Sequence, residues 1–401
     1  MNLNTWRGLR IVLAACALMA FAACDKGKKD GGGTGSGGSG GANNPPPASG
    51  SIVVGHFASM TGPQATFGIS TDQAIRLAIE EKNAKGGIKG RKIELVTIDD
   101  AGKQTEAVTA VTRLINDHKV VAILGEVASS LSLAGGPVAQ KAKIPMISPS
   151  STNPDVTDVG DYVFRVCFLD DFQGWVDAKF ARENLKATKA AILYDQAQAY
   201  SSGLADYFEK AFKEMGGTIV TKQAYTGGNL EITSQLQSIK SAGAEVVFLP
   251  GYYSDAGTII RKARESGIKA PFLGGVGWDS EELPKIAGDA INGNYFSNHY
   301  APEEDRPEVK NFVENYKKKY GSTADGLAAL GYDAALVLFD AIERAPSTSG
   351  KDLRDAIAAT KNFTGVTGTF SIDENRNAMK SAVIVEYKGG KQTMSARIEK
   401  K

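Results

Sequence analysis

The sequence predicts an α/β protein built from two Rossmann-like lobes with parallel sheets. From residue 51 onward, short runs of β-branched and aromatic residues alternate with longer segments whose apolar residues recur at helical spacing. Such alternation is typical of βαβ units, whose strands are parallel. The part of the chain that follows residue 50 is about 350 residues long. That length is large for a single sheet of this kind and therefore favours two lobes.

The predicted strands are Ile52–Phe57, Lys92–Ile98, Val120–Leu124, Ile144–Ile147, Ala190–Tyr194, Glu245–Leu249, Asn294–Ser297 and Ala382–Tyr387, and residues 162–168 are also β-rich. The predicted helices are Thr71–Asn83, Thr105–Asp117, Gly203–Met215, Ile232–Ser241, Ser254–Ser266, Pro307–Tyr320 and Ala324–Arg344. The first of these helices places Ile75, Ala78 and Ile79 on one face, and a Gly-Gly pair follows its end. Ligands of such sheets bind beyond the carboxyl ends of the strands, so the loops that follow strands are expected to form the site.

The composition excludes several classes of protein. The 401 residues include 46 basic and 45 acidic side chains, a net charge of +1, and 42% are hydrophobic. A chain that binds nucleic acid is usually strongly basic, so we expect no nucleic-acid partner. The mean hydropathy of -0.20 argues against a polytopic membrane protein, and the many aliphatic residues argue against a disordered chain.

Residues 1–23 have the pattern of a secretory signal peptide. Arg7 and Arg10 precede an apolar run over residues 11–23, which is shorter than the roughly 20 residues that span a membrane. The run ends in the letters FAAC, which resemble the lipobox of bacterial lipoproteins, so Cys24 is the expected site of lipid attachment. The letters LAAC end at Cys16, but cleavage there would leave an h-region of about five residues. The alternative is a plain signal peptide with an incidental cysteine.

Residues 24–50 are expected to form a tether between the lipidated cysteine and the folded body. Glycine and serine dominate this segment, and three consecutive prolines add a short stiff piece. Cleavage before Cys24 removes two arginines and no acid, so the balance of charges becomes 44 − 45 = −1. Only Cys24 and Cys167 would then remain. Because Cys24 would be acylated, no internal disulfide is expected.

Motifs of enzymes are mostly absent. The sequence has no G-x-G-x-x-G, no P-loop and no G-x-S-x-G elbow, so we expect neither an enzyme nor a cofactor. The histidines are His56, His118 and His299, and none has a histidine or cysteine at metal-ligand spacing, so no metal site is expected. His118 is expected to be a solvated residue at a helix end, His56 a packed strand residue and Cys167 a buried hydrophobic residue.

Three segments that follow predicted strands are rich in small hydroxyl residues and glycine. They are residues 125–130 (GEVASS), 148–154 (SPSSTNP) and 251–254 (GYYS). Serine or threonine at a helix start offers a hydroxyl beside the free N–H groups at the positive end of the helix dipole. Such a place binds an anion, including a carboxylate. The alternative is that these residues only cap helices, but two such segments in one lobe favour anion binding.

The pattern resembles the periplasmic branched-chain amino-acid binding proteins of ABC importers, which have the type I periplasmic binding protein fold. The matching pieces run in family order and cover nearly the whole body: IVVGHFASMTGP (52–63), NAKGGIKGR (83–91), IDD (98–100), ISPSSTNP (147–154), FR (164–165), GYY (251–253), IAGDA (286–290) and GVTGTF (365–370). The resemblance implies two lobes joined by a three-segment hinge, with crossings near residues 170, 299 and 372. Lobe 1 would then comprise residues 51–169 with 300–371, and lobe 2 residues 170–299 with 372–401.

The resemblance also implies the side chains that contact the ligand. Ser129, Ser150 and Thr152 match positions that hold the α-carboxylate and part of the amine. Phe67 matches an aromatic residue that lines the ligand from the first lobe. Tyr200 and Tyr252 match residues of the second lobe that close over it. Ser151 and Asp279 are two further candidates. The expected ligand-binding residues are therefore Phe67, Ser129, Ser150, Ser151, Thr152, Tyr200, Tyr252 and Asp279.

One position departs from the family pattern. Val276 stands where amino-acid binders commonly have an acid that pairs with the ligand's ammonium. A buried ammonium without a carboxylate partner is unfavourable. Either Asp279, Glu126 or Asp171 takes that role, or the ligand lacks the ammonium. Val276 itself could simply pack in the hydrophobic core.

The expected function is an extracytoplasmic solute-binding protein of an ABC importer. It would capture a small amino acid, branched-chain or similar, between its lobes, close around it and deliver it to a permease in the inner membrane. We expect a periplasmic monomer, anchored to a membrane through lipid on Cys24. One alternative is a sensor of the same fold that signals to a membrane kinase or chemoreceptor. Another is a binder of a small carboxylate or amide without an amine, and an exported α/β enzyme is the third.

Overall fold

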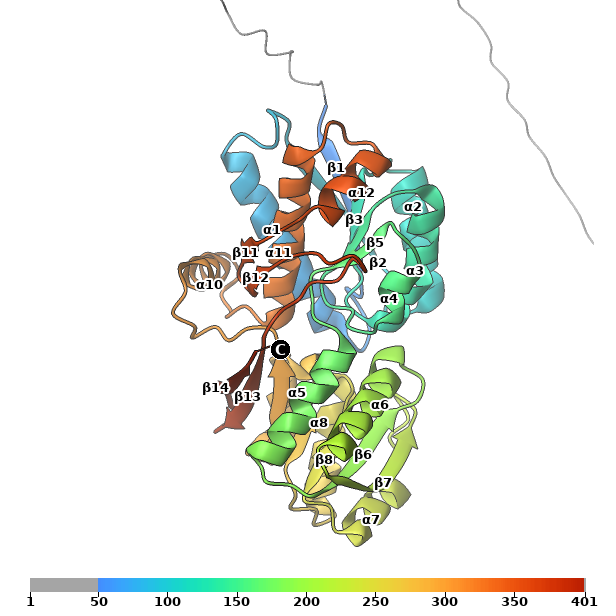
Figure 1. Cartoon of the computed structure of the whole chain (residues 1–401), viewed down its shortest axis with the longest axis vertical. Coiled ribbons are helices and arrows are strands. Elements are labelled where there is room, and N and C mark those ends of the chain that lie inside the picture. The colour runs from blue at the N-terminus through green and yellow to red at the C-terminus, as the bar shows by residue number, and fades with distance from the viewer. Residues whose placement is uncertain (1–49, 400–401) are drawn as a thin grey trace, which may run out of the picture. The chain divides into compact units, whose positions relative to one another are not determined.

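The structure is a computed structural model, and it describes residues 50–399. The predicted signal peptide, the lipid attachment at Cys24 and nearly all of the predicted tether lie outside the described residues. Within residues 50–399 the strands form two large sheets, each flanked by helices (Figure 1). We name the parts built around these sheets lobe 1 and lobe 2. No helix in this range is long and apolar enough to cross a membrane.

Lobe 1 contains a five-stranded parallel sheet with the order β2-β1-β3-β4-β5. Its strands are β1 (Ile52–Ala58), β2 (Ile93–Asp99), β3 (Ala122–Leu124), β4 (Met146–Ser148) and β5 (Val163–Arg165). Its helices are α1 (Ala65–Ala84), α2 (Gln104–Asn116), α3 (Ser129–Ala142), α4 (Asp155–Asp158), α10 (Pro307–Tyr320), α11 (Gly326–Arg344) and α12 (Gly350–Ala358). Helices α1 and α11 pack together, as do α2 and α3. A small hairpin pairs β11 (Phe363–Gly365) with β12 (Gly368–Phe370).

Lobe 2 contains a seven-stranded mixed sheet with the order β14-β13-β10-β9-β8-β6-β7. Its strands are β6 (Lys189–Asp195), β7 (Thr218–Tyr225), β8 (Val246–Phe248), β9 (Phe272–Gly274), β10 (Tyr295–Asn298), β13 (Ala382–Lys388) and β14 (Lys391–Ile398). Its helices are α5 (Asp170–Glu183), α6 (Ala199–Glu214), α7 (Thr233–Ala242), α8 (Tyr253–Glu265) and α9 (Glu282–Ala287), with the 3-10 turns η1 (Val276–Trp278) and η2 (Gly288–Ile291). Strand β13 runs antiparallel to both β10 and β14, and the remaining neighbours are parallel.

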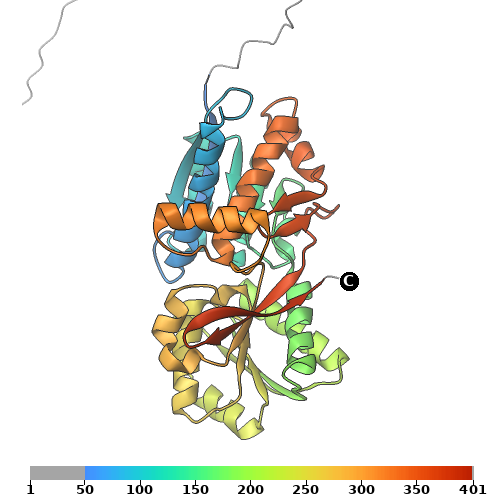
Figure 2. The ribbon, with the colours of Figure 1, turned by 90° about the vertical axis from the view of Figure 1, so that its left-hand side faces the viewer.

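The chain passes between the two sheets three times. It leaves lobe 1 between β5 and α5, returns between β10 and α10, and enters lobe 2 again between β12 and β13 (Figure 2). Each lobe is therefore assembled from segments that are far apart in the sequence. The carboxyl ends of β3 and β4 in lobe 1 and of β8 and β9 in lobe 2 are the positions from which the loops of the site begin.

The buried core explains why the predicted strands form. All eight overlap observed strands, and most of their Val, Ile, Leu and Phe side chains are buried, although β2 is largely half-buried. Cys167 is buried and reduced, and burial raises the pKa of its thiol to about 11. His56 is buried in the central strand β1, where its Nδ1 lies 2.9 Å from the carbonyl oxygen of Leu124. His118 is exposed beyond the end of α2. The expectations for these three side chains are confirmed.

Candidate functional site

A small cavity lies between the two lobes. The cavity is nearly closed, with a volume of about 10 Å³, which is about the room that one water molecule needs. Lobe 1 contributes side chains from α1, α3, α11 and the loops after β3 and β4, and lobe 2 contributes α6, η1 and the loop before α8. The lining residues are Phe67, Val127, Ser129, Ser150, Tyr200, Tyr252, Val276, Gly277 and Leu327.

Hydroxyl groups line the lobe 1 side of the cavity. Ser129 is the first residue of α3, whose free N–H groups and positive dipole end favour an anion. Ser150 follows β4 and donates to the carbonyl oxygen of Val127 at 3.4 Å. The Ser129 hydroxyl accepts a hydrogen bond of 3.3 Å from the N–H of Asn153. The two loops that follow β3 and β4 therefore present their serines at one place, as the sequence predicts.

Two other predicted site residues have different surroundings and do not line the cavity. The Ser151 hydroxyl lies 2.9 Å from the carbonyl oxygen of Glu126 and 2.8 Å from the Ser132 hydroxyl, so it joins the loops to each other. The carbonyl oxygen of Thr152 accepts from the N–H of Asp170 at 2.9 Å, which ties this loop to the first crossing between the lobes. Both side chains are buried.

Aromatic rings close the lobe 2 side. Tyr200 and Tyr252 stack with 5.4 Å between their centroids, and Phe67 of lobe 1 packs edge-on against Tyr252 at 5.8 Å. The Tyr200 hydroxyl accepts a hydrogen bond from the N–H of Gly277 at 3.2 Å. Among the described residues, the Tyr252 hydroxyl is buried and has no hydrogen-bond partner. A buried hydroxyl without a partner, on a residue that lines a cavity, is a candidate for binding a polar group of a ligand.

None of the three acids considered for the ligand's ammonium lines the cavity. Asp171 is exposed, and its carboxylate accepts from the N–H of Phe172. Glu126 precedes the lining residue Val127, but its carboxyl accepts from the backbone N–H groups of Ser59 and Ala128. Burial, together with the nearby Asp100, raises the pKa of Glu126 well above its usual range. The third acid, Asp279, is 2% exposed and accepts hydrogen bonds only from protein groups.

Sequence reasoning missed three lining residues. Val127 and Gly277 stand next to residues that the sequence did single out, so their position in the two loops was the available signal. Leu327 lies in the first turn of α11, about 175 residues beyond the serine loops, and only the tertiary fold brings it to the cavity. Nothing in its local sequence distinguishes it from the other apolar residues of that helix.

Hydrogen bonds between the lobes hold the walls of the cavity together. The Ser130 hydroxyl donates to the Gln198 side chain at 3.1 Å and accepts from the N–H of Ala199 at 3.0 Å. The Asn153 side chain donates to the carbonyl oxygen of Ala199 at 3.0 Å. These bonds join the serine loops of lobe 1 to the start of α6 in lobe 2. The lobes therefore meet through polar contacts at the rim of the cavity.

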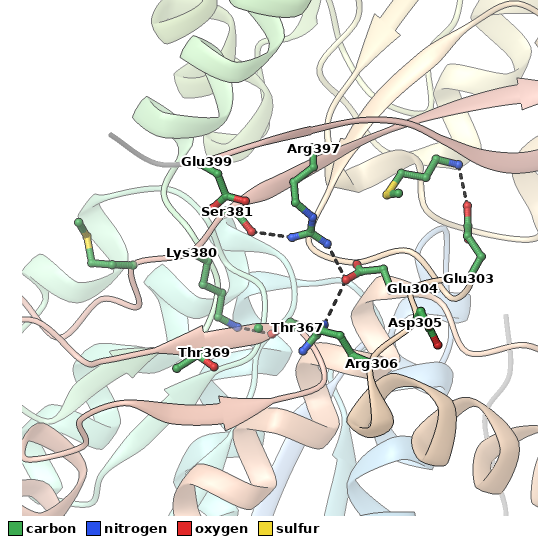
Figure 3. A pocket seen from close by; sticks show the side chains of 13 residues that line it. Glu303, Glu304, Asp305, Arg306, Thr367, Thr369, Lys380, Ser381, Arg397 and Glu399 are labelled. Carbon is green, nitrogen blue, oxygen red and sulfur yellow. Dashed lines mark hydrogen bonds and ion pairs between the residues drawn. The ribbon is translucent and has the colours of Figure 1, made fainter.

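A second, more open groove lies where β14 of lobe 2 approaches the segment that follows β10. Figure 3 shows the Glu304 carboxylate between Arg306 and Arg397. Arg397 contacts the Glu304 carboxylate at 2.5 Å, Arg306 contacts the same carboxylate at 3.2 Å, and Arg397 also donates to the Ser381 hydroxyl at 2.8 Å. The arginines and Glu304 of this groove therefore already pair with each other.

We expect Asp170→Asn to stabilise the protein at pH 8 but not at pH 4. Burial at the start of α5 raises the pKa of Asp170 to about 7, although Thr152 and Arg165 lower it. The folded protein therefore holds this proton more tightly than the unfolded chain, whose pKa is near 3.8. The contribution to stability is complete below that value and is lost as the pH rises to about 7. Urea unfolding at both pH values measures it. An equal change at both pH values would contradict the prediction, and Asp289→Asn, an exposed acid, is the control.

Two α/β lobes that meet around a small cavity lined by hydroxyl groups define a two-lobed solute receptor. A family described as periplasmic binding protein matches residues 51–392. The chain belongs to this periplasmic binding protein family, which is a family of solute-binding proteins of transporters and not of enzymes. The resemblance, the fold class and the general function inferred from the sequence are confirmed at this level.

Three similar proteins illustrate the relationship. The structure of a leucine-binding protein from Thermotoga maritima has a TM-score of 0.84 and 40% identity, and the match covers 87% of this chain and 99% of that chain. A branched-chain amino acid transporter substrate-binding protein from Streptococcus pneumoniae, solved in complex with isoleucine, has a TM-score of 0.82, 32% identity and the same coverage. The Leu/Ile/Val-binding protein homolog 3 of Brucella melitensis is 33% identical over 302 residues, which are 75% of this chain and 81% of that protein.

Proposed function

We propose that the protein captures a small amino acid, branched-chain or similar, in the interlobe cavity and delivers it to an ABC permease. The observation that carries this proposal is the composition of the cavity, which combines two serines and a helix N-terminus with aliphatic and aromatic side chains. The serines and the helix N-terminus suit a carboxylate, and the aliphatic and aromatic residues suit an apolar side chain. The relatives named for leucine, isoleucine and valine binding support the same ligand class.

The ligand-contacting set that we propose is narrower than the set expected from the sequence. Ser129 and Ser150, with the N–H groups at the start of α3, would hold the carboxylate. Phe67 and Tyr252 would cover the apolar part, and the Tyr252 hydroxyl would donate to a polar atom of the ligand. Burial raises the pKa of Tyr252 well above its usual range, so this hydroxyl keeps its proton and remains a donor. No step of turnover is required of these groups.

A small carboxylate without an amine is the second candidate ligand. The observation that favours it is the absence of any carboxylate among the residues that line the cavity within the described part of the chain. Val276, which occupies the position where an acid is common in amino-acid binders, lines the cavity with its apolar side chain. An ammonium bound there would rely on carbonyl and hydroxyl oxygens.

The remaining parts of the proposal concern the setting of the receptor. We propose export to the periplasm, lipid attachment at Cys24 as the membrane anchor, and action as a monomer beside an inner-membrane permease. Residues 51–169 with 300–371 would move as lobe 1 and residues 170–299 with 372–401 as lobe 2. The three crossings described above would act as the hinge.

Leucine and 4-methylpentanoate, which is leucine without its amino group, form a matched pair of probes. We expect leucine to bind and to raise the free energy of unfolding by about 2.7 kcal/mol at 100 times its dissociation constant. Calorimetric titration and thermal unfolding measure this. Binding of 4-methylpentanoate alone would select the second candidate, and binding of neither compound nor of any other small amino acid would contradict both.

Ser150→Ala tests the site itself. We expect this variant to weaken leucine binding by roughly 1–3 kcal/mol, because a buried carboxylate would lose one hydrogen-bond donor. Ser238→Ala, which changes an exposed serine on α7, is the matched control and should bind as the unaltered protein does. Equal affinities of the two variants in a calorimetric titration would remove Ser150 from the proposed site.

A further inference from the structure

Two consecutive residues of lobe 2, Asp279 and Ser280, each make a hydrogen bond to lobe 1. The Asp279 Oδ2 atom accepts from the N–H of Gly326 at 2.6 Å. The Ser280 hydroxyl lies 3.0 Å from the hydroxyl of Thr66. Gly326 is the first residue of α11 and Thr66 lies in the first turn of α1, so one short segment of lobe 2 contacts two helix starts of lobe 1. We call these four residues the interlobe clamp.

Both oxygens of the Asp279 carboxylate accept hydrogen bonds from other groups of the protein. Besides the bond to Gly326, its Oδ2 atom accepts from the Asn298 side chain at 2.7 Å, and its Oδ1 atom accepts from the Gln392 side chain at 2.9 Å. Asn298 and Gln392 belong to β10 and β14 of lobe 2. Lobe 2 therefore fixes the direction of the carboxylate, and the only donor from lobe 1 among these three is the Gly326 N–H.

In both lobes, the clamp residues are close in sequence to residues that line the cavity. In lobe 2, the lining residues Val276 and Gly277 precede Asp279 by two or three positions. In lobe 1, the lining residue Phe67 follows Thr66, and the lining residue Leu327 follows Gly326. Each side of the clamp is thus joined to a cavity wall by only a few backbone bonds, so the walls and the clamp must approach or separate together.

We propose that Asp279 and Ser280 stabilise the closed arrangement of the lobes and set how long a captured ligand is retained. This inference rests on the proposed capture of a ligand between the lobes. Asp279 is a positioning residue, because it touches the first turn of α11 and not the cavity. Without the Asp279 carboxylate, the start of α11, which carries Leu327, would lose its hydrogen bond to the lobe 2 segment that lines the cavity.

The electrostatic setting favours this role. The N-terminus of α11 carries the positive end of a 19-residue helix dipole, which attracts the negative carboxylate. Asp325, the N-cap residue of the same helix, is half-buried and accepts from the N–H of Ala328 at 2.7 Å. Burial and the nearby Asp279 raise the pKa of Asp325 to about 8. Burial raises the pKa of Asp279 as well, so the two neighbouring carboxyls repel each other less once one of them holds a proton.

The decisive measurement is the rate of leucine dissociation from Asp279→Ala. We expect roughly 10- to 100-fold faster dissociation, because a hydrogen bond to a charged group is lost only from the closed form. We expect Asp279→Asn to remain within a few-fold of the unaltered protein, because its amide oxygen can still accept from Gly326 and Asn298. Small-angle scattering with saturating leucine should show a larger radius of gyration for Asp279→Ala alone. Asp289→Ala, an exposed acid of lobe 2, is the matched control.

A double-mutant cycle tests the second contact. Thr66→Ala and Ser280→Ala should each speed dissociation by about 3- to 10-fold, and the double variant should be no faster than either single variant. Unchanged dissociation in Asp279→Ala, or an Asn variant as impaired as the Ala variant, would overturn the clamp. These outcomes require that the unaltered protein binds leucine. Failure of the unaltered protein to bind any small solute would instead contradict the proposed function.

Discussion

Replacing Arg165 by methionine should lower the free energy of unfolding by roughly 2–6 kcal/mol. The Arg165 side chain, at the end of β5, is 0% exposed. Its guanidinium donates to the carbonyl oxygens of Ser151 at 2.6 Å and Pro154 at 3.0 Å, and to the Thr157 hydroxyl at 3.1 Å. One side chain therefore holds the loop that carries Ser150 to the cavity.

The expected loss comes from the groups that remain. Methionine has a similar length and is apolar, so the change leaves little empty space. The two carbonyl oxygens, however, would stay buried without their donors, and each such group carries a desolvation penalty of about 1–3 kcal/mol. The segment after β4 would relax to find water, and Ser150 would move with it. We therefore also expect weaker ligand binding in Arg165→Met.

Urea unfolding measures the first effect, and Arg113→Met provides the matched control. Arg113 lies on the surface of α2, is 55% exposed and forms an ion pair of 3.9 Å with Asp117. Exposed pairs contribute little, so this variant should stay within about 0.5 kcal/mol of the unaltered protein. If both variants lost the same stability, the buried hydrogen bonds of Arg165 would not be what holds the loop.

The fold was predictable where burial leaves a clear pattern in the sequence. Strands such as β1 and β6 are buried on both faces and appear as continuous apolar runs. The edge strand β7 was missed, because its residues are half-buried and its sequence, TIVTKQAY, mixes polar and apolar side chains. Helix α5 was also missed, although Phe172, Val176 and Phe180 recur at every fourth position, because its many charged residues obscure that spacing.

The start of the first helix shows where the spacing of apolar residues fails to predict a helix boundary. Apolar spacing predicted that the first helix begins at Thr71, whereas α1 begins at Ala65. The additional residues include Phe67, which is buried against Tyr252 and Tyr253 of the other lobe. Apolar spacing reflects burial in the core of one lobe, so it does not identify residues that are buried at a contact between the lobes.

The site was predictable where a strand end and a hydroxyl residue coincide. Ser129, Ser150 and Tyr252 follow predicted strands, and all three line the cavity. Asp279 was selected for its charge alone, but its hydrogen-bond partners come from β10, β14 and α11, which are distant in sequence. The sequence therefore indicates which chemical groups are present near the cleft, whereas the tertiary contacts decide which of them remain available to a ligand.

Replacing Gly277 by alanine should weaken ligand binding by about 100-fold, because this residue lines the cavity and packs closely against three neighbouring groups. A Cβ atom added at Gly277 would overlap the carbonyl oxygen of Gly251 and would lie 3.0 Å from the Tyr200 ring and 3.1 Å from the Tyr252 ring. The carbonyl oxygen belongs to the backbone and cannot rotate away. The η1 turn must therefore shift, and the hydrogen bond from the Gly277 N–H to the Tyr200 hydroxyl would be lost.

The loss should appear mainly in binding and not in folding. Lost contacts of about 2.8 kcal/mol in the displaced segment lower the affinity about 100-fold, whereas the strain of one added methyl group is typically about 1–3 kcal/mol. Calorimetric titration with leucine measures the affinity, and thermal unfolding without ligand measures the strain. Gly136→Ala is the matched control, since a Cβ atom there meets only ordinary contacts of 3.5 Å and beyond, within helix α3. Equal leucine affinities for the two alanine variants would show that the η1 turn does not shape the binding cavity.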